Sequence, residues 1–451
     1  MFGSAQPLPI WVAVAAVAMA IGLQVQTTAH IGDSQIRLAI ADLFIPVIFV
    51  IALAHSPGFF TARWRVRHIW AWLGVLSAAF TIALVVGRIG AGEWIRWAVF
   101  NKYAGWYVLL MYFLVGGWLA AAYGDVATQT FLRWFLVTFW ASCALVGFWY
   151  FPQFELGSVF FLEGVRFQAL MENPNAFGIL AALAIAVQAP QLAAKKLFTR
   201  HCHVLGLTVA FIALVYSGSR SAWLGLIFGY LILIFTRSVS MRHTLAAGVL
   251  ASFVFVAPVV LPSQIASFLV PPPVRGGDAT SALPGAVSLT RLNFSDKDTA
   301  IRMRTMKAAL AMWQDRPIVG VGLGGYIASE KRRGAILAPT GPAAGDPGRQ
   351  LVLIHNSALW LLTETGLLGA AAFIGFFLAC FHALGRDIRS DTRDPLSAGM
   401  LAALFVFAGA SLGTEVLYQR HFWFLLGCAL ALQPTSNCAR SRAEGAVECG
   451  S

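Results

Sequence analysis

The chain has 451 residues, of which 58% are hydrophobic and 12% are charged, with a formal net charge of +12 and a mean hydropathy of +0.72. A soluble domain carries about a quarter charged residues, so this composition excludes an ordinary soluble protein. The apolar runs are continuous rather than alternating, which excludes a transmembrane β-barrel. We therefore expect an all-α integral membrane protein.

About twelve apolar runs are long enough to cross a bilayer as helices. In chain order they cover residues 8–25, 36–54, 69–88, 103–122, 131–150, 174–189, 203–218, 221–236, 244–262, 358–382, 396–412 and 421–433. This pattern predicts four parts: helices 1–9 in 1–262, a long loop in 263–354, helices 10–12 in 355–433 and a tail in 434–451. The first run lacks a preceding Lys or Arg, so we expect it to remain as a helix rather than to be cleaved as a signal peptide.

The distribution of Lys and Arg predicts the orientation of the chain. With the N-terminus inside, the cytoplasmic loops carry about twice as many of these residues as the short loops on the opposite side. The loop 263–354 and His355 are then outside and the tail 434–451 is cytoplasmic. Because anionic inner-leaflet lipids favour such a bias, the basic charge indicates contact with membrane lipids and no nucleic-acid partner.

The long loop contains one predicted helix. Residues 263–297 are rich in Pro, Gly and Ser and predict an irregular segment. Residues 298–315 predict an amphipathic helix that begins at Asp298 or Thr299 and has Arg302 and Lys307 away from its apolar stripe. The expected stripe is Ile301, Met306, Ala309, Leu310 and Trp313.

A glycine run, Gly320–Tyr326, follows Pro317. It does not predict a dinucleotide site, because no strand–turn–helix unit and no ribose-binding acid surround it. We expect a tight turn that packs against the membrane face.

Arginine dominates the charges on the predicted outer side. The cationic residues there include Arg37, Arg88, Arg166, Arg220, Arg291, Arg302 and Arg304. Guanidinium groups bind phosphate oxygens bidentately and keep their charge at any working pH, so this pattern favours a substrate with two phosphates and a leaving diphosphate stabilised without a metal. Clustered carboxylates or His/Cys sets that would hold a metal do not stand out, and we expect no cofactor.

His355 stands where the polar loop turns into an apolar run. An imidazole titrates near neutrality and can accept a proton, so His355 is a candidate base; it is equally an N-terminal helix residue satisfied by a backbone group. Glu364 lies within the apolar run, where a carboxylate is costly and needs a partner. We expect Glu364 to have a local role.

The arginines also have structural interpretations. Arg220 lies in a short connection, where an arginine can reach lipid headgroups. Arg166 can pair with Glu163, and Arg302 and Arg304 can belong to a solvated helix face. The segment that begins at Asn173-Pro174-Asn175 is a good helix start whatever the function.

Two motifs resemble those of the bacterial O-antigen ligase and polymerase superfamily. The segment Arg220-Ser221-Ala222-Trp223-Leu224 resembles its Arg-x-x-x-Leu motif. His355-Asn356, followed by Gly366-Leu367-Leu368-Gly369, resembles its His-Asn-x9-Gly-x-x-Gly motif. Asn173-Pro174-Asn175-x-x-Gly178 and Gly320-x-Gly322-x-Gly324 are similar to secondary signatures, and the spans and the long loop extend the resemblance over most of the chain.

The resemblance implies a multi-pass, GT-C-like glycosyltransferase of the bacterial inner membrane with its active site on the periplasmic face. It implies transfer of a glycan from undecaprenyl diphosphate to a hydroxyl acceptor, with inversion. His355 would be the general base, and Arg220, Arg166, Arg302, Arg304 and Arg291 would bind the diphosphate. Glu364 and Asn356 would support them, with Glu364 orienting His355 or an arginine.

Within this superfamily the pair of motifs favours an O-antigen ligase that uses lipid A-core as acceptor. A repeat-unit polymerase and a protein O-oligosaccharyltransferase are the alternatives, although the latter usually has a longer C-terminal region. A transporter of the lipid-linked glycan would need more ionisable groups deep within spans and repeated halves. Here the deep charges are few, Asp42 and Glu364 among them, and no repeat is visible.

Overall fold

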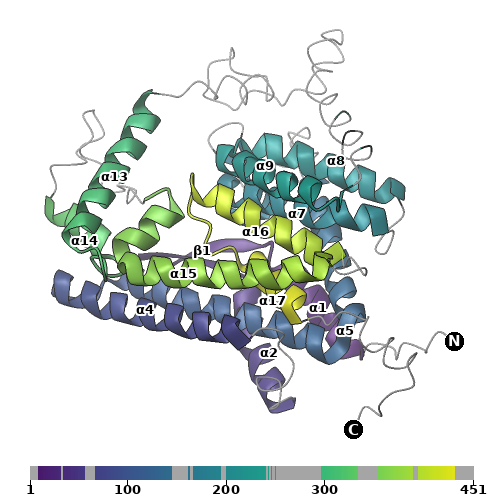
Figure 1. Ribbon diagram of the computed structural model, residues 1–451, viewed down its shortest axis with the longest axis horizontal. Coiled ribbons are helices and arrows are strands. Elements are labelled where there is room, and N and C mark those ends of the chain that lie inside the picture. The colour runs from purple at the N-terminus through teal and green to yellow at the C-terminus, as the bar shows by residue number, and fades with distance from the viewer. Residues whose placement is uncertain are drawn as a thin grey trace.

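The computed structural model describes residues 9–31, 34–55, 67–144, 161–162, 166–194, 200–239, 242, 245, 249, 296–333, 354–389 and 395–431. This part of the chain is mostly helical (Figure 1). The helices are α1 Ile10–Gly22, α2 Ala41–His55, α4 Arg67–Ala91, α5 Gly105–Ala144, α7 Pro174–Ala194, α8 Arg200–Ser217, α9 Arg220–Phe235, α13 Asp296–Asp315, α14 Gly325–Arg333, α15 Ser357–Arg389, α16 Pro395–Ser411 and α17 Arg420–Ala431. A π-helical turn, η1 Ala98–Ala104, leads into α5, and a 3-10 turn, η4 Ala169–Met171, precedes α7.

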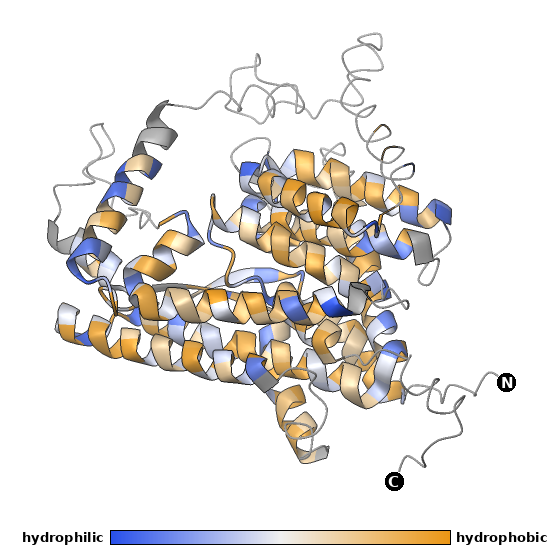
Figure 2. Cartoon of the chain, viewed as in Figure 1, coloured by the Kyte–Doolittle hydropathy of each residue, from blue (hydrophilic) through white to orange (hydrophobic). Residues whose placement is uncertain are grey.

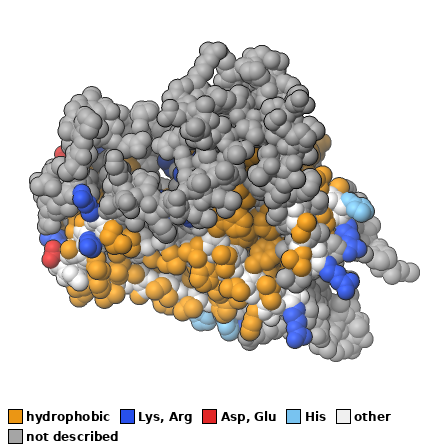
Figure 3. All heavy atoms as spheres, turned by 90° about the horizontal axis from the view of Figure 1, so that it is seen from above, with side chains coloured by type: hydrophobic (Ala, Val, Ile, Leu, Met, Phe, Trp, Pro, Cys, Tyr) orange, Lys and Arg blue, Asp and Glu red, His pale blue; other side chains and the backbone are white. Residues whose placement is uncertain are grey.

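The apolar character of the helices supports an all-α membrane protein. Among the described residues, 5 helices are long and apolar enough to cross a membrane: His68–Ala91, Ala98–Ala144, Pro174–Leu192, Arg200–Ser217 and Ser357–Arg386. Figure 2 shows hydrophobic residues along most of the length of the long helices. In Figure 3 the described part of one face is a broad apolar field with Lys and Arg side chains near its two edges, as expected for a surface that meets lipid.

Helices occupy every predicted span except 244–262, which lies almost entirely outside the described residues. The run 103–122 begins in η1 and continues in α5, which also contains the described part of the run 131–150. Gly124, with φ 63° and ψ −151°, interrupts α5 between the two runs. The number of membrane crossings remains a prediction.

The start of the predicted span 36–54 is wrong. Residues Ser34–Ala39 form strand β2, which pairs antiparallel with β1, Gln26–Ile31, in the register Gln26↔Ala39. Helix α2 begins only at Ala41, and the Asp42 carboxylate in its first turn accepts a hydrogen bond from the Ala39 backbone N–H at 2.8 Å, which ties the helix start to the end of β2. A second, shorter hairpin joins β3 Phe161–Leu162 to β4 Arg166–Phe167, so the fold is helical with two small hairpins.

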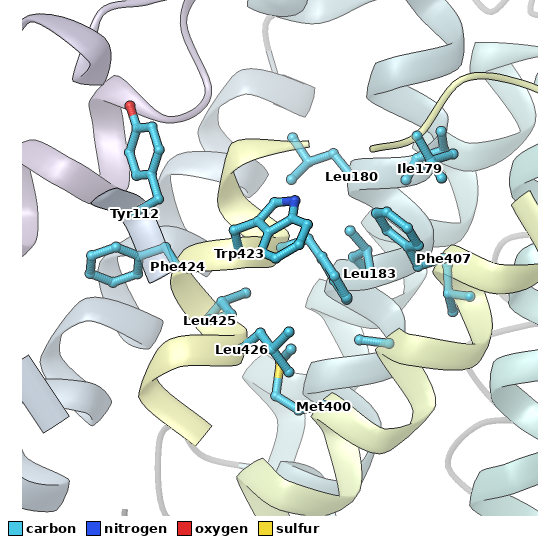
Figure 4. Packing of buried hydrophobic residues seen from close by; sticks show 14 of the residues in the cluster. Tyr112, Ile179, Leu180, Leu183, Met400, Phe407, Trp423, Phe424, Leu425 and Leu426 are labelled. Atoms are coloured by element: carbon cyan, nitrogen blue, oxygen red, sulfur yellow. The ribbon is translucent and has the colours of Figure 1, made fainter. Parts of the chain in front are cut away.

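The centre of the bundle consists of α7, α16 and α17, whose residues are nearly all buried. Figure 4 shows Trp423 and Phe424 of α17 among buried side chains that include Leu183 of α7 and Phe407 of α16. Helices α5 and α17 approach so closely that a methyl group on Gly427 would overlap the Phe113 carbonyl. Small residues at such a crossing let two apolar helices pack by van der Waals contact.

Several connections meet at one end of this bundle. Arg420, at the start of α17, donates to the Arg37 carbonyl of β2 at 2.7 Å and to Asp42 Oδ1 at 2.7 Å. The Leu323 N–H donates to the Ala83 carbonyl of α4 at 2.8 Å, and Figure 1 shows α13 and α14 at the same end of α4 and α15. These segments are the ones that the Lys and Arg distribution assigns to the outer side.

Candidate functional site

The connection between α16 and α17, residues 412–419, holds the candidate site together. Asn356 Nδ2 donates to the Leu412 carbonyl at 3.0 Å, and Arg302 Nη1 donates to the Gly413 carbonyl at 3.4 Å. Ser357 Oγ donates to the Thr414 carbonyl at 3.1 Å and accepts from the Val416 N–H at 2.8 Å. The end of the long loop and the α13 helix are therefore fastened to the same short segment.

His355 is presented at the start of α15. Asn356 caps that helix, since its Oδ1 accepts from the Leu359 N–H at 2.9 Å. The flanking residues Ile354 and Ser357 are buried, whereas His355 itself is exposed. The Asn of the motif thus fixes the backbone while the His side chain remains open to a substrate.

The surroundings of His355 favour its neutral form. Partial burial among protein atoms lowers the pKa of His355 below its ordinary value, and the positive charge of Arg302 lowers it further. The negative charge of Glu415 acts in the opposite direction. A neutral imidazole can accept a proton, so the environment agrees with a general base.

The structure separates Arg302 from Arg304 on α13. Arg302 is half-buried and faces the connection, whereas Arg304 is exposed. The buried face of α13 also holds Thr305, Ala309 and Met312. Thr363 Oγ1 of α15 donates to the Ala309 carbonyl at 3.2 Å.

The predicted apolar stripe of α13 is thus wrong in part. Met306 and Leu310 are 39% and 42% exposed, whereas Ala309, which we expected on the same stripe, is buried. Arg302 was expected to point away from that face and instead lies on it. The reason is that residues 302, 305, 309 and 312 share one side of the helix at helical spacing, and this side packs on α15.

Arg220 is the exposed first residue of α9, and Ser219 caps the helix by accepting from the Ala222 N–H. The next residue, Ser221, lies against the connection at Gly413. The two are so close that a side-chain Cβ added to Gly413 would lie only 2.5 Å from Ser221 Oγ. The start of α9 is therefore beside the segment that binds Asn356 and Arg302.

Arg166 is tied to the turn before Arg220. Its Nε donates to the Ser217 carbonyl at 3.0 Å, and its Nη2 donates to Asn175 Oδ1 at 2.6 Å. Asn173 Oδ1 caps α7 by accepting from the N–H groups of Asn175 and Ala176, as the expected helix start requires. The side chain of Arg166 thus supports the α8–α9 turn. Arg291 and Glu163, which the sequence offered for diphosphate binding and for pairing with Arg166, lie outside the described residues.

Glu364 contacts Trp360 rather than the expected His355 or arginine. It is 1% exposed, and its Oε2 accepts from Trp360 Nε1 at 2.9 Å. A backbone hydrogen bond from Gly324 and the positive charge of Lys102 also act on it. Its expected role in orienting His355 or an arginine stays a prediction.

Sequence reasoning missed the pair formed by Lys102 and Glu415. The two side chains form an ion pair at the same end of the bundle, with exposed fractions of 2% and 23%. The signal was a lysine within an aromatic-rich apolar run, since ionisable residues in such runs are costly and mark functional or paired positions.

The glycine run is part of the same architecture. Helix α15 is interrupted at Gly366, which has φ 65° and ψ −165°. The segment after α13 fills the interruption: the Leu367 N–H donates to the Pro317 carbonyl at 2.9 Å, and the Val321 N–H donates to the Thr363 carbonyl at 2.9 Å. The expected tight turn is present, since the Gly325 N–H donates to the Gly322 carbonyl, and the segment also bonds to α4 through Leu323. Its packing against the membrane face stays a prediction.

Among the described residues, no group of three or more His, Cys, Asp or Glu side chains could hold a metal ion. Residues 205–374 match the family described as O-antigen ligase, and no curated protein matches the chain. The matched range runs from α8 into α15 and includes Arg220, Arg302, His355 and Gly366.

Proposed function

We propose that the chain is an O-antigen ligase. The match over residues 205–374 supports membership of the O-antigen ligase superfamily, whose members are glycosyltransferase-like enzymes. The chain transfers O-polysaccharide from undecaprenyl diphosphate to the lipid A-core of lipopolysaccharide. The reaction takes place on the periplasmic face of the bacterial inner membrane.

One observation supports this proposal above the others. The 412–419 connection binds the residue next to His355, binds Arg302, and abuts the residue next to Arg220. The segments that carry a candidate base and two arginines, far apart in the sequence, therefore lie beside one connection at the predicted outer end of the bundle. A base beside cations suits attack by a hydroxyl on a carbon that carries a diphosphate.

The proposed reaction is a single displacement. His355 takes the proton of the acceptor hydroxyl as the hydroxyl oxygen forms a bond to the anomeric carbon. The bond from that carbon to the diphosphate oxygen breaks, and the electron pair leaves with the diphosphate. Attack opposite the leaving group inverts the anomeric configuration. Arg220 and Arg302, helped by Arg304, balance the charge that develops on the leaving group, and Arg166 supports the turn that carries Arg220.

The first experiment replaces the base and one arginine. We expect His355→Ala and Arg220→Ala to lose at least about a hundred-fold of O-antigen attachment in a strain that lacks its native ligase, because removal of a base or of a charge-stabilising group costs that much. Lipopolysaccharide is read on a gel. His68→Ala and Arg96→Ala, which change exposed residues outside the site, serve as matched controls.

If both site variants insert normally and still attach O-antigen, the catalytic assignment is wrong. The null strain separates the ligase from a polymerase of the same superfamily. A ligase defect leaves long glycan on undecaprenyl diphosphate and bare core, whereas a polymerase defect leaves core that bears one repeat unit.

A further inference from the structure

Lys102 is enclosed in a cage of aromatic rings. Its Nζ lies 4.3 Å from the centroid of the Trp360 ring and 4.8 Å from those of Trp97 and Tyr418. The fourth neighbour is the carboxylate of Glu415. Aromatic faces attract a cation most strongly where water is excluded, and the Lys102 side chain is 2% exposed.

Residue 102 also fixes the connection at a second point. Tyr418 Oη donates to the Lys102 carbonyl at 2.9 Å, so both ends of the segment 415–418 are bonded to one residue of η1. Between these two points, Val416 donates to Ser357 at the start of α15. The lysine therefore holds the segment to which Asn356 and Arg302 are also bonded.

A buried ion pair has no general advantage in stability over apolar residues of the same volume. Its presence at this position calls for a reason beyond folding. The position of Glu415 suggests such a reason, because its negative charge acts on His355 in opposition to the positive charge of Arg302. Glu415 lies next to Thr414, whose carbonyl accepts from Ser357, so a shift of Glu415 would move the helix start that presents His355.

We propose that Lys102 and Glu415 are a positioning pair, which holds the 412–419 connection against α15 and so sets the position and the charge environment of His355 relative to Arg302. The inference rests on the proposed function, because it assigns the pair a part in the same transfer. Neither residue touches the reacting atoms. Lys102 orients Glu415, and Glu415 acts through His355 and through the backbone that carries it.

A double-variant experiment distinguishes positioning from a purely structural role. The variants are Lys102→Met, Glu415→Gln and the two combined, with Lys307→Met and Glu93→Gln as matched exchanges at exposed positions. Thermal unfolding of the full-length protein in detergent measures stability, and O-antigen attachment measures activity. Each single variant leaves one uncompensated charge or polar group, so we expect its Tm to fall and the Tm of the double variant to recover.

The activity of the double variant decides between the two roles. We expect attachment to stay roughly ten- to hundred-fold below that of the unmodified protein although stability has returned, since small displacements of a catalytic group cost that much. If attachment returns together with stability, the pair is structural and the proposal is overturned. If Lys102→Met does not fold, the Glu415→Gln and double variants carry the same comparison.

A measurement that does not depend on transfer keeps the inference separate from the proposed function. The pH dependence of His355 acylation by diethyl pyrocarbonate, read by mass spectrometry, reports its protonation. We expect the midpoint in Glu415→Gln to move to lower pH, because an opposing negative charge is removed. An unchanged midpoint would overturn the inference. A shifted midpoint in a protein that attaches no O-antigen would reject the proposed function and keep the effect of Glu415 on His355.

Discussion

The proton affinity of His355 is set by opposing influences. Its partial burial and the charge of Arg302 lower its pKa, and the charge of Glu415 raises it. The charge of Arg302 thus acts on the candidate base. If the proposed diphosphate donor binds at Arg302, we expect its negative charge to offset that of Arg302 and so to raise the pKa of His355.

This arrangement predicts the pH dependence of the reaction. A base acts in its deprotonated form, so kcat/KM should be constant near neutral pH and fall only as the pH drops through the lowered pKa of His355. Arg302→Gln removes a positive charge and should move this acid limb to higher pH, in addition to reducing the rate. The measurement is transfer in detergent across pH, with Arg316→Gln as an exposed control. An acid limb in the same place in Arg302→Gln would contradict the prediction.

Some residues of the site could be predicted from the chain and others could not. His355 and Arg220 could be proposed because they lie in short spaced motifs, and Asn173 could be predicted because helix caps are local. Lys102 and Glu415 are 313 positions apart in sequence, and no local pattern indicates that they pair. Their contact depends on how η1 packs against the α16–α17 connection, which is a property of the tertiary fold.

At the scale of elements, the interruption of α15 explains why its motif contains glycine. The N–H groups of Leu367 and Leu368, freed by the break, donate to the carbonyls of Pro317 and Ile318. Gly366 adopts a backbone conformation that is essentially restricted to glycine, and a side chain there would overlap the Ile318 carbonyl. The helix that presents His355 and the segment that continues from α13 are therefore built as one unit.

We accordingly expect Gly366→Ala to destabilise the protein by about 1–3 kcal/mol from backbone strain, and by more from the overlap with Ile318. Gly385→Ala, in the same helix with open space around it, should be neutral or slightly stabilising. Thermal unfolding of both variants in detergent tests this difference. Equal melting temperatures for the two variants would contradict the role of the interruption.

The α13 helix shows where periodicity alone misleads. Its amphipathic pattern correctly predicted a helix, but it has apolar residues on more than one side. The chain cannot show which side packs, because that choice depends on Thr363 and the other residues of α15 that it meets. Met303, Met306 and Leu310 are left exposed on the other side of the helix rather than in the core.

At the scale of the whole molecule, hydropathy predicted which helices are apolar enough to cross a membrane. It did not predict which of them lie at the centre of the bundle and which at its surface. Helix α4 has the highest mean hydropathy among the five long apolar helices and is mostly unburied, whereas α7 is almost wholly buried with a lower value. This is expected where lipid is as apolar as the protein interior, since the central helices are distinguished by small residues and close packing. Gly427 of α17 and its contact with α5 illustrate that distinction.

The orientation of the bundle leads to the last prediction. Glu93 follows α4 at the end where α13 and the connection 412–419 lie, and Cys202 is exposed at the start of α8, on the predicted inner side. A membrane-impermeant maleimide should therefore label Glu93→Cys in cells with a permeable outer membrane, in a background where Cys438 and Cys449 are serine. Cys202 should react only after the inner membrane is opened, which also makes it the internal control.

Labelling of Cys202 before Glu93→Cys would reverse the orientation and place His355 on the cytoplasmic side. The proposed transfer to a periplasmic acceptor would then be impossible, so this experiment tests the membrane topology and the proposed function together.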